Sequence, residues 1–286
     1  MSRYLAMFDR LAAQGELAFG AFVMLGDPDL ERSARLLDAL VEGGADMVEV
    51  GIPFSDPVAD GPVIQAAAVR ALARGVTPAD CFALLRAFRK RHADVPVGIL
   101  TYANLVVARG LDAFYRAAAE AGVDSVLVAD VPFLESPRFA EAAAAAGIDP
   151  VLIAAPNTPE AVLRGIAGTA RGYTYCVARA GVTGADREVR FDAGMIARLK
   201  ALAAPPPVLG FGISRPEHVH LARAAGAAGA ISGSAIVSLG ADVDAVRRFA
   251  AEMKAATSSP LSPGERGRGG GATEHEERPR LHLRAN

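Results

Sequence analysis

The sequence of 286 residues has no tryptophan, only two cysteines and almost no excess of charge of one sign. Two cysteines, Cys81 and Cys176, are too few for a disulfide framework, which excludes a small disulfide-stabilised secreted scaffold. We expect both to be ordinary buried thiols in a reducing compartment. The formal net charge of −2 gives the chain no overall attraction to nucleic acid or to an anionic membrane, but a local site for a phosphorylated small molecule is compatible with it.

Long apolar runs are absent as well. No stretch reaches the roughly 18 uninterrupted apolar residues that a membrane span requires. Residues 1–11 show the spacing of an amphipathic helix and lack the continuous apolar region of a signal peptide. The chain does have ample material for a large core, because 51% of its residues are hydrophobic and only 22% are charged. We therefore expect a folded, cytoplasmic protein with neither a membrane nor a nucleic-acid partner.

Short apolar runs recur along the chain and alternate with longer helical patterns. They begin on average about every 30 residues, the length of one strand-plus-helix unit. The runs are 19–24, 46–50, 97–100, 125–128, 150–153, 173–177, 207–209 and 228–231. Strict alternation of strand and helix predicts a parallel sheet. Eight units in about 256 residues predict an α/β fold, a closed (β/α)₈ TIM barrel with an extra N-terminal helix. An open doubly wound sheet is the alternative, because periodicity alone does not demonstrate closure.

The composition changes at about Thr257. Residues 257–286 are rich in glycine, proline and serine at first, then in charged residues of both signs, and show no hydrophobic periodicity. Such a segment cannot bury enough apolar surface to fold. We therefore predict a single TIM-barrel domain over residues 1–256 and a disordered tail over residues 257–286.

The second run ends with an acidic side chain, at the end of the strand where such barrels carry their active sites. Side chains alternate between the two faces of a strand, so in Met47-Val48-Glu49-Val50-Gly51 the two valines face helices and Glu49 points into the barrel. Apolar surroundings raise the pKa of a carboxyl group, which makes Glu49 a candidate general acid or base. The alternative is a structural ion pair with an arginine or lysine, and this residue by itself does not decide between the two.

A loop over residues 51–62 follows this run. A mere connection between a strand and a helix does not need a dozen residues. Within the loop, Asp60 is a candidate for a second carboxylate placed over Glu49. The alternatives for Asp60 are a helix N-cap and a simple turn residue.

The last two runs are each followed by glycines, in Gly210-Phe211-Gly212-Ile213-Ser214 and in Ser232-Gly233-Ser234-Ala235-Ile236. Glycine lets the backbone approach a ligand closely, and barrels often bind a phosphate at these two loops. The alternative is a pair of tight turns with no ligand, since neither loop is a P-loop or a dinucleotide-binding motif. Residues 179–186 follow the sixth run with two more glycines, and we predict that they form a lid over the phosphate.

No spacing typical of a metal site is present. His218 and His220 are two residues apart on a predicted helix and therefore do not face one ion. We expect both, and His92, to be surface residues. Tyr175 shares a strand face with Tyr173, and we expect Tyr175 to form part of the wall of the barrel mouth.

Long motifs occur in order along the chain. They are Leu25-Gly26-Asp27-Pro28, residues 49–65 (EVGIPFSDPVADGPVIQ), Tyr102-Ala103-Asn104, Ala129-Asp130-Val131-Pro132, Arg179-Ala180-Gly181-Val182-Thr183-Gly184, Gly210-Phe211-Gly212-Ile213-Ser214 and Ile231-Ser232-Gly233-Ser234-Ala235. Through these motifs the sequence closely resembles the α subunits of tryptophan synthase over about residues 2–256. Residues 20–24 (GAFVM) depart from the family, which often has proline or threonine there, and the tail lies outside the family pattern.

The resemblance implies a (β/α)₈ barrel that cleaves indole-3-glycerol phosphate to indole and glyceraldehyde 3-phosphate, a retro-aldol step of L-tryptophan biosynthesis. It implies that Glu49 and Asp60 are the catalytic carboxylates, Glu49 for proton transfer and Asp60 for the indole N–H. The residues implied to bind the substrate form two groups. The indole wall is Phe22, Leu100, Leu127, Ala129, Ile153, Tyr175, Phe211 and Ile231, and the phosphate site is Thr183, Gly184, Gly212, Gly233 and Ser234.

The resemblance also implies a partner, a pyridoxal-phosphate-dependent β subunit that receives indole through a tunnel, in an α₂β₂ heterotetramer. The α chain itself is then expected to need no cofactor. The segments implied to face the partner are Pro53–Asp60, Tyr102-Ala103-Asn104 and Asp130-Val131-Pro132.

Two other functions stay open at this point. A different phosphate-binding barrel, such as a sugar-phosphate isomerase or an indole-glycerol-phosphate synthase, would need a catalytic lysine or an aspartate pair on other strands. The only lysines are Lys90, Lys200 and Lys254, and none follows a predicted strand. A barrel that merely activates a β partner is the other possibility, and the presence of both carboxylates argues against it.

Overall fold

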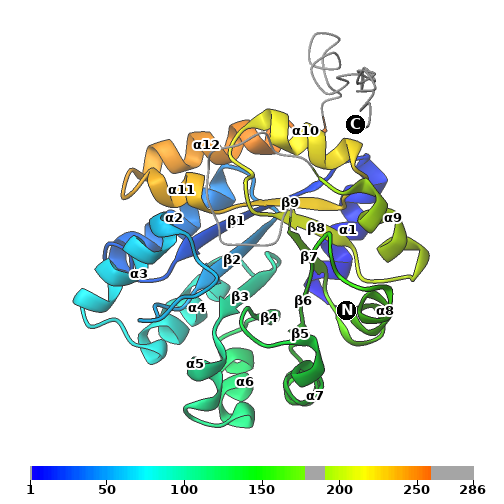
Figure 1. The fold of residues 1–286 in the computed structure, drawn as a ribbon. Helices are drawn as coiled ribbons and strands as arrows, with labels where there is room; N and C mark the ends of the chain where they lie inside the picture. The colour runs from blue at the N-terminus through cyan, green and yellow to red at the C-terminus, as the bar shows by residue number, and fades with distance from the viewer. Residues whose placement is uncertain (1, 178–190, 259–286) are drawn as a thin grey trace, which may run out of the picture.

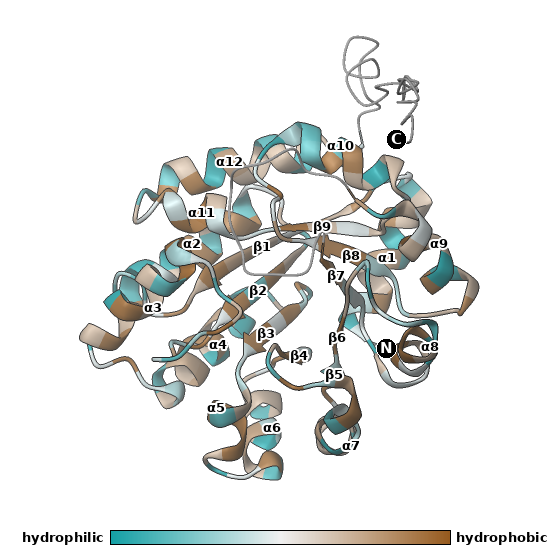
Figure 2. Ribbon diagram, viewed as in Figure 1, coloured by the Kyte–Doolittle hydropathy of each residue, from teal (hydrophilic) through white to brown (hydrophobic). Residues whose placement is uncertain are grey.

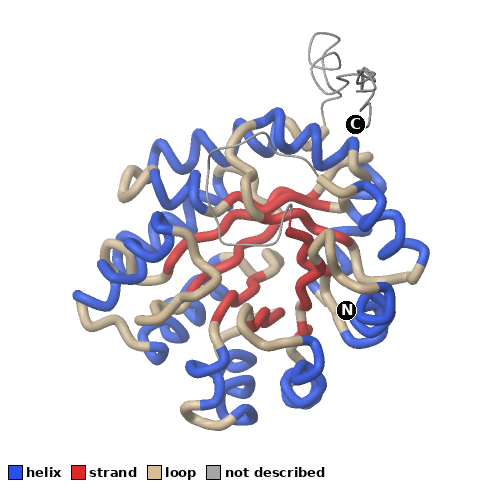
Figure 3. Tube along the Cα trace, in the orientation of Figure 1, coloured by secondary structure: helices blue, strands red, loops and turns tan. Residues whose placement is uncertain are grey.

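The computed structural model describes residues 2–177 and 191–258. Within this part of the chain nine strands form one parallel sheet, which Figure 3 shows at the centre of the molecule with helices around it. The strands are β1 (Ala18–Met24), β2 (Met47–Gly51), β3 (Val97–Thr101), β4 (Ser125–Val128), β5 (Asp149–Pro150), β6 (Leu152–Ala154), β7 (Thr174–Val177), β8 (Pro207–Gly210) and β9 (Gly229–Ser232).

The sheet curls round until its two ends meet. The strand order is β5-β4-β3-β2-β1-β9-β8-β7-β6, so the ends of the ladder are β5 and β6. Only Val151 separates these two strands in sequence, and its amide donates to the carbonyl of Val126 in β4 (3.1 Å). The predicted run 150–153 is therefore one strand with an interruption, which pairs with β4 at its start and with β7 at its end. The predicted (β/α)₈ barrel is confirmed, and the open sheet is excluded.

Apart from the first helix, the helices follow strands and surround the outside of the sheet (Figure 1). They are α1 (Arg3–Gln14), α2 (Leu30–Glu42), α3 (Pro62–Ala73), α4 (Pro78–Arg91), α5 (Ala103–Val107), α6 (Leu111–Glu120), the 3₁₀ helix η1 (Phe133–Glu135), α7 (Ser136–Ala145), α8 (Glu160–Thr169), α9 (Ala193–Ala201), α10 (Pro216–Ala224), α11 (Ser234–Ser238) and α12 (Val243–Ala255). The helix signals in the sequence have a local cause. At α4, for example, Thr77 and Asp80 satisfy each other's backbone amides, and Pro78 occupies the first turn.

Apolar side chains form two separate layers, and hydrophobic colour follows the strands in Figure 2. One layer lies between the strands and the surrounding helices and includes Val48 and Val50. The other fills the inside of the barrel and continues onto Tyr4, Met7 and Leu11 of α1. The predicted N-terminal helix therefore covers the amino-terminal end of the barrel and leaves the opposite end available for a site.

The folded part of the chain extends to Thr257, one residue beyond the predicted domain boundary at residue 256. Thr257 is fully buried, and its carbonyl accepts hydrogen bonds from the Leu17 amide (3.3 Å) and from the Arg223 guanidinium. The rest of the predicted tail from residue 259 lies outside the described residues. Cys81 and Cys176 are both buried and free, as predicted. No helix in the described part of the chain is long and apolar enough to cross a membrane.

Candidate active site

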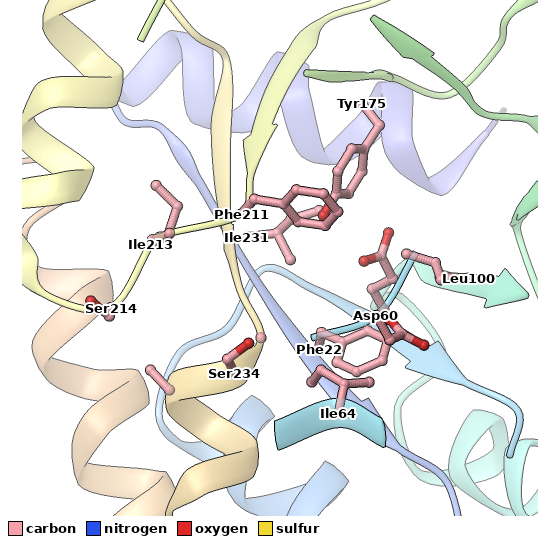
Figure 4. Close-up of a pocket in the computed structure, with 14 residues that line it drawn as sticks. Phe22, Asp60, Ile64, Leu100, Tyr175, Phe211, Ile213, Ser214, Ile231 and Ser234 are labelled. Carbon is pink, nitrogen blue, oxygen red and sulfur yellow. The ribbon is translucent and has the colours of Figure 1, made fainter. Parts of the chain in front are cut away.

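A pocket opens at the carboxyl ends of the strands, with an empty volume of about 530 Å³ that includes the open space at its mouth. Its walls come from segments far apart in sequence, because the barrel brings the ends of β1, β2, β3, β7, β8 and β9 together (Figure 4). The lining residues are Phe22, Glu49, Asp60, Ile64, Leu100, Tyr175, Phe211, Gly212, Ile213, Ser214, Ile231, Gly233, Ser234 and Ala235.

Glu49 points from β2 into the barrel, in register with Phe22 of β1 and Gly98 of β3. Its side chain is buried, and its Oε1 accepts a hydrogen bond from the Tyr173 hydroxyl (2.8 Å). Burial raises the pKa of Glu49 from 4.5 to about 7. The hydrogen bond from Tyr173 opposes this shift, and the negative charge of Asp60 adds a still smaller increase. No arginine or lysine in the described part of the chain forms an ion pair with it. Within the described residues, Glu49 is therefore not part of a structural ion pair with an arginine or lysine.

Asp60 lies at the end of the loop between β2 and α3, and it too is buried. The N-cap of α3 is Gly61, so Asp60 is not the cap residue. Its Oδ2 accepts a hydrogen bond from the Tyr102 hydroxyl (2.8 Å), and that hydroxyl in turn accepts one from the Ala59 amide (3.3 Å). Burial raises the pKa of Asp60 above its ordinary value. Two buried carboxyl groups thus face one cavity.

The middle of the pocket is apolar. Five of the eight residues implied for the indole wall do line it: Phe22, Leu100, Tyr175, Phe211 and Ile231. The other three, Leu127, Ala129 and Ile153, belong to the same interior apolar cluster but do not line the cavity. The rings of Tyr175 and Phe211 meet edge to face, 5.9 Å apart.

The glycine-rich loops form one end of the pocket. Gly212, Gly233 and Ser234 line it as expected, while Thr183 and Gly184, and with them the predicted lid over 179–186, lie outside the described residues. Figure 4 shows Ser214 and Ser234 on the opposite side of the cavity from Asp60, with Phe22 and Phe211 between them. The pocket therefore has an acidic end, an aromatic middle and an end rich in backbone amides.

Four residues that line the pocket were not among the expected site residues: Ile64, Ile213, Ser214 and Ala235. The two tyrosines that contact the carboxylates, Tyr173 and Tyr102, were not expected either. The strand alternation that directs Tyr175 inward also directs Tyr173 inward, so that signal was available. No sequence pattern linked Tyr102 to Asp60, because 42 residues separate them and only the packing of β3 beside β2 brings them together.

The histidines differ from the prediction that they are surface residues. His218 is buried, because its ring turns inward from α10 under the loop that follows β8. Both ring nitrogens of His220 are buried, and His92 is half-buried with its Nε2 2.8 Å from an oxygen of Asp38. In the described part of the chain, His, Cys, Asp and Glu side chains do not cluster in a way that could hold a metal ion.

The matches to known proteins agree with this geometry. The family model for the tryptophan synthase alpha chain matches residues 8–260. This chain belongs to that family. It is 52% identical over 266 residues to the tryptophan synthase alpha chain of Cronobacter sakazakii, an alignment that covers 90% of this chain and 99% of that one.

Solved structures of tryptophan synthase share the fold. A chain of the Mycobacterium tuberculosis tryptophan synthase superimposes with a TM-score of 0.82 at 31% identity, covering 90% of this chain and 99% of that one. The tryptophan synthase subunit alpha of Legionella pneumophila str. Paris superimposes with a TM-score of 0.82 at 30% identity, covering 90% and 98%. As a tryptophan synthase alpha chain by family, this protein is a carbon–carbon lyase of tryptophan biosynthesis.

Proposed function

We propose that Glu49 and Asp60 are the catalytic groups with which this chain cleaves indole-3-glycerol phosphate to indole and glyceraldehyde 3-phosphate. The observation that carries the proposal is the pair of buried carboxyl groups in one cavity, of which Glu49 has a pKa of about 7. A group with such a pKa exchanges protons readily near neutral pH, which a general acid–base catalyst requires.

The reaction breaks a carbon–carbon bond, and the electrons of that bond need an acceptor. Protonation of the indole ring at the carbon that carries the glycerol chain makes the ring such an acceptor. The bond then breaks as a hydroxyl group of the glycerol chain loses its proton and becomes the aldehyde. Glu49 serves for both proton transfers, because one proton is taken up at the ring and one is released from the hydroxyl. No water is consumed, and atoms and charge balance.

Asp60 acts on the other side of the ring. Ring protonation leaves positive charge on the indole nitrogen, and a carboxylate that accepts the N–H hydrogen bond stabilises that charge. The Tyr102 hydroxyl supports this role, because it fixes the Asp60 carboxylate in a buried position. The aromatic middle of the pocket would bind the flat indole ring, and the amides of Gly212, Gly233 and Ser234 would bind the phosphate.

Exposed apolar side chains near the pocket indicate where a protein partner would bind. Three successive segments at the carboxyl end of the barrel expose apolar side chains, Val58 (69% exposed), Val107 (42%) and Leu134 (88%). Exposed apolar side chains on one rim favour a protein partner, and we propose a β subunit in an α₂β₂ assembly in the cytoplasm. The pyridoxal phosphate would belong to that subunit, and this chain would work without a cofactor.

The decisive experiment is incubation of the chain with indole-3-glycerol phosphate, with and without a β subunit, while free indole is measured. Glu49→Gln is expected to lower the rate of indole release by about 10²- to 10⁴-fold, the usual contribution of general acid–base catalysis. Glycerol 3-phosphate should still bind to that variant. Glu16→Gln is the matched control, because Glu16 lies away from the pocket and pairs with Lys254. Full activity of Glu49→Gln would reject the assignment.

A further inference from the structure

One peptide unit at the phosphate end of the pocket is held from both sides. The carbonyl of Ile213 accepts a hydrogen bond from the Ser232 hydroxyl in β9 (2.7 Å). The amide of Ser214, in the same peptide unit, donates to Nδ1 of His218 in α10 (3.2 Å). Both residues are buried: Ser232 has no exposed surface, and His218 is 6% exposed. Because a peptide unit is planar, these two contacts fix its orientation.

The loop requires such support because its backbone is strained. Phe211 has a φ of +67°, which is unfavourable for a residue with a side chain, and Gly212 follows with a φ of +80°. A conformation of this kind persists only where the surroundings hold it in place. Ser232 and His218 hold the loop directly after its two left-handed residues.

The orientation of the loop decides which amides are available to a ligand. The Ser214 amide is taken by His218, whereas the amides of Gly212 and Ile213 have no hydrogen-bond acceptor among the described residues. Both residues line the pocket. Unpaired backbone amides at a pocket wall are the groups that bind phosphate oxygens.

His218 suits the role of acceptor. Burial, and then the guanidinium of Arg215, lower the pKa of His218 below its ordinary value, so the ring is neutral near pH 7 and Nδ1 can accept. The Arg215 Nη2 atom lies 3.3 Å from Nε2. A hydrogen bond with the backbone of Gly212, and then the charge of Glu217, raise the pKa of His218, but with smaller effect.

We propose that His218 and Ser232 are positioning residues that hold the Ile213–Ser214 peptide so that the preceding amides point at the substrate phosphate. This inference rests on the proposed function, because it assumes a phosphorylated substrate. Neither side chain lines the pocket. Both are expected to act on the affinity for phosphate and not on proton transfer.

The test compares His218→Leu, His218→Asn and Ser232→Ala with the unmodified chain. His218→Leu and Ser232→Ala should each raise KM for indole-3-glycerol phosphate, and Kd for glycerol 3-phosphate, by about tenfold, the effect of about one lost hydrogen bond. The kcat should stay within about twofold, since neither residue takes part in proton transfer. His218→Asn should recover most of the affinity, because asparagine matches leucine in shape and offers an oxygen close to the position of Nδ1.

Control measurements separate positioning from general damage. His220→Leu makes the same change two residues along α10 and should leave KM and Kd unaltered, because His220 does not line the pocket and its ring nitrogens have no partner among the described residues. Binding of indole, which has no phosphate, should also be unaltered in all variants. The double variant Ser232→Ala/His218→Leu should lose less affinity than the product of the single losses, because both residues hold one peptide.

Several results would overturn the inference: an unchanged KM in both single variants, an equal loss of indole binding, or an asparagine variant no better than the leucine variant. Thermal unfolding identifies any variant that fails to fold, and Ser232→Ala, the smallest change, carries the test if His218→Leu fails. If the unmodified chain releases no indole, the proposed function is wrong. The Kd values for glycerol 3-phosphate still test the loop in that event.

Discussion

Replacing Glu49 by glutamine should make the protein more stable while it removes activity. The pKa of Glu49 is about 7 in the folded protein, against 4.5 for an unperturbed glutamate. The folded state therefore binds this proton more tightly than the unfolded state, and ionisation of Glu49 opposes folding. The difference corresponds to about 3 kcal/mol at a pH above 7, because each pKa unit is worth about 1.4 kcal/mol. Glutamine has a similar shape, stays neutral and can still accept from the Tyr173 hydroxyl.

The size of this stabilisation varies with pH in a defined way. Below pH 4.5 both states are protonated at Glu49, and the variant should match the unmodified protein. Between pH 4.5 and 7 the unmodified protein loses stability through this group, so the advantage of Glu49→Gln grows, and above pH 7 it stays constant. Urea unfolding at a series of pH values, followed by circular dichroism, measures this difference directly.

The matched control reverses the sign. The pKa of Glu16 is lowered, chiefly by the hydrogen bond from Lys254. The Glu16 carboxylate therefore stabilises the folded state at a pH above the pKa that Glu16 has in the unfolded chain. This stabilisation is lost as the pH falls. Glu16→Gln should therefore be slightly less stable than the unmodified protein at neutral pH and equal to it in acid. A Glu49→Gln variant that is no more stable at pH 8 than at pH 4, relative to the unmodified protein, would refute the reasoning about burial of this carboxylate.

Three other predictions follow from single contacts. Tyr173→Phe removes the hydrogen bond to the Glu49 carboxylate (2.8 Å) and should move the corresponding limb of the kcat/KM pH profile upward by about one pH unit or more; an unmoved profile would show that this bond does not set the pKa. Tyr102→Phe removes the hydrogen bond to Asp60 and should lower kcat/KM by about tenfold, which steady-state kinetics would measure; Tyr115→Phe, on the far side of the strands, is its control and should have no effect on turnover. A chain ending at Ser258 should keep full turnover and stability, whereas one ending at Ala256 should unfold at lower temperature because it lacks the buried Thr257; equal melting temperatures would contradict this.

Local sequence determined much of the fold. The alternation of apolar runs with capped helical patterns predicted the strand-and-helix units, because strand and helix periodicity are properties of a few neighbouring residues. The strand Ser125–Val128 agrees to the residue, and the ends of the other runs differ from the observed strands by at most one residue. The run 150–153 is in addition interrupted at Val151. The same local rule of alternation turned Glu49 into the barrel, since its neighbours Val48 and Val50 had to face helices.

Only the tertiary structure decided how segments distant in the chain meet. Closure of the barrel depends on β5 and β6 completing the ladder, and no local pattern contains that information. The sequence also did not determine which side chains surround each carboxylate. Tyr173 is 124 residues from Glu49, and Tyr102 is 42 residues from Asp60. His218 could be taken for a surface residue because the sequence does not show that the loop after β8 folds over it. A pKa depends on burial and on nearby charges in space, so the sequence could nominate Glu49, but only the packed barrel could raise its pKa to about 7.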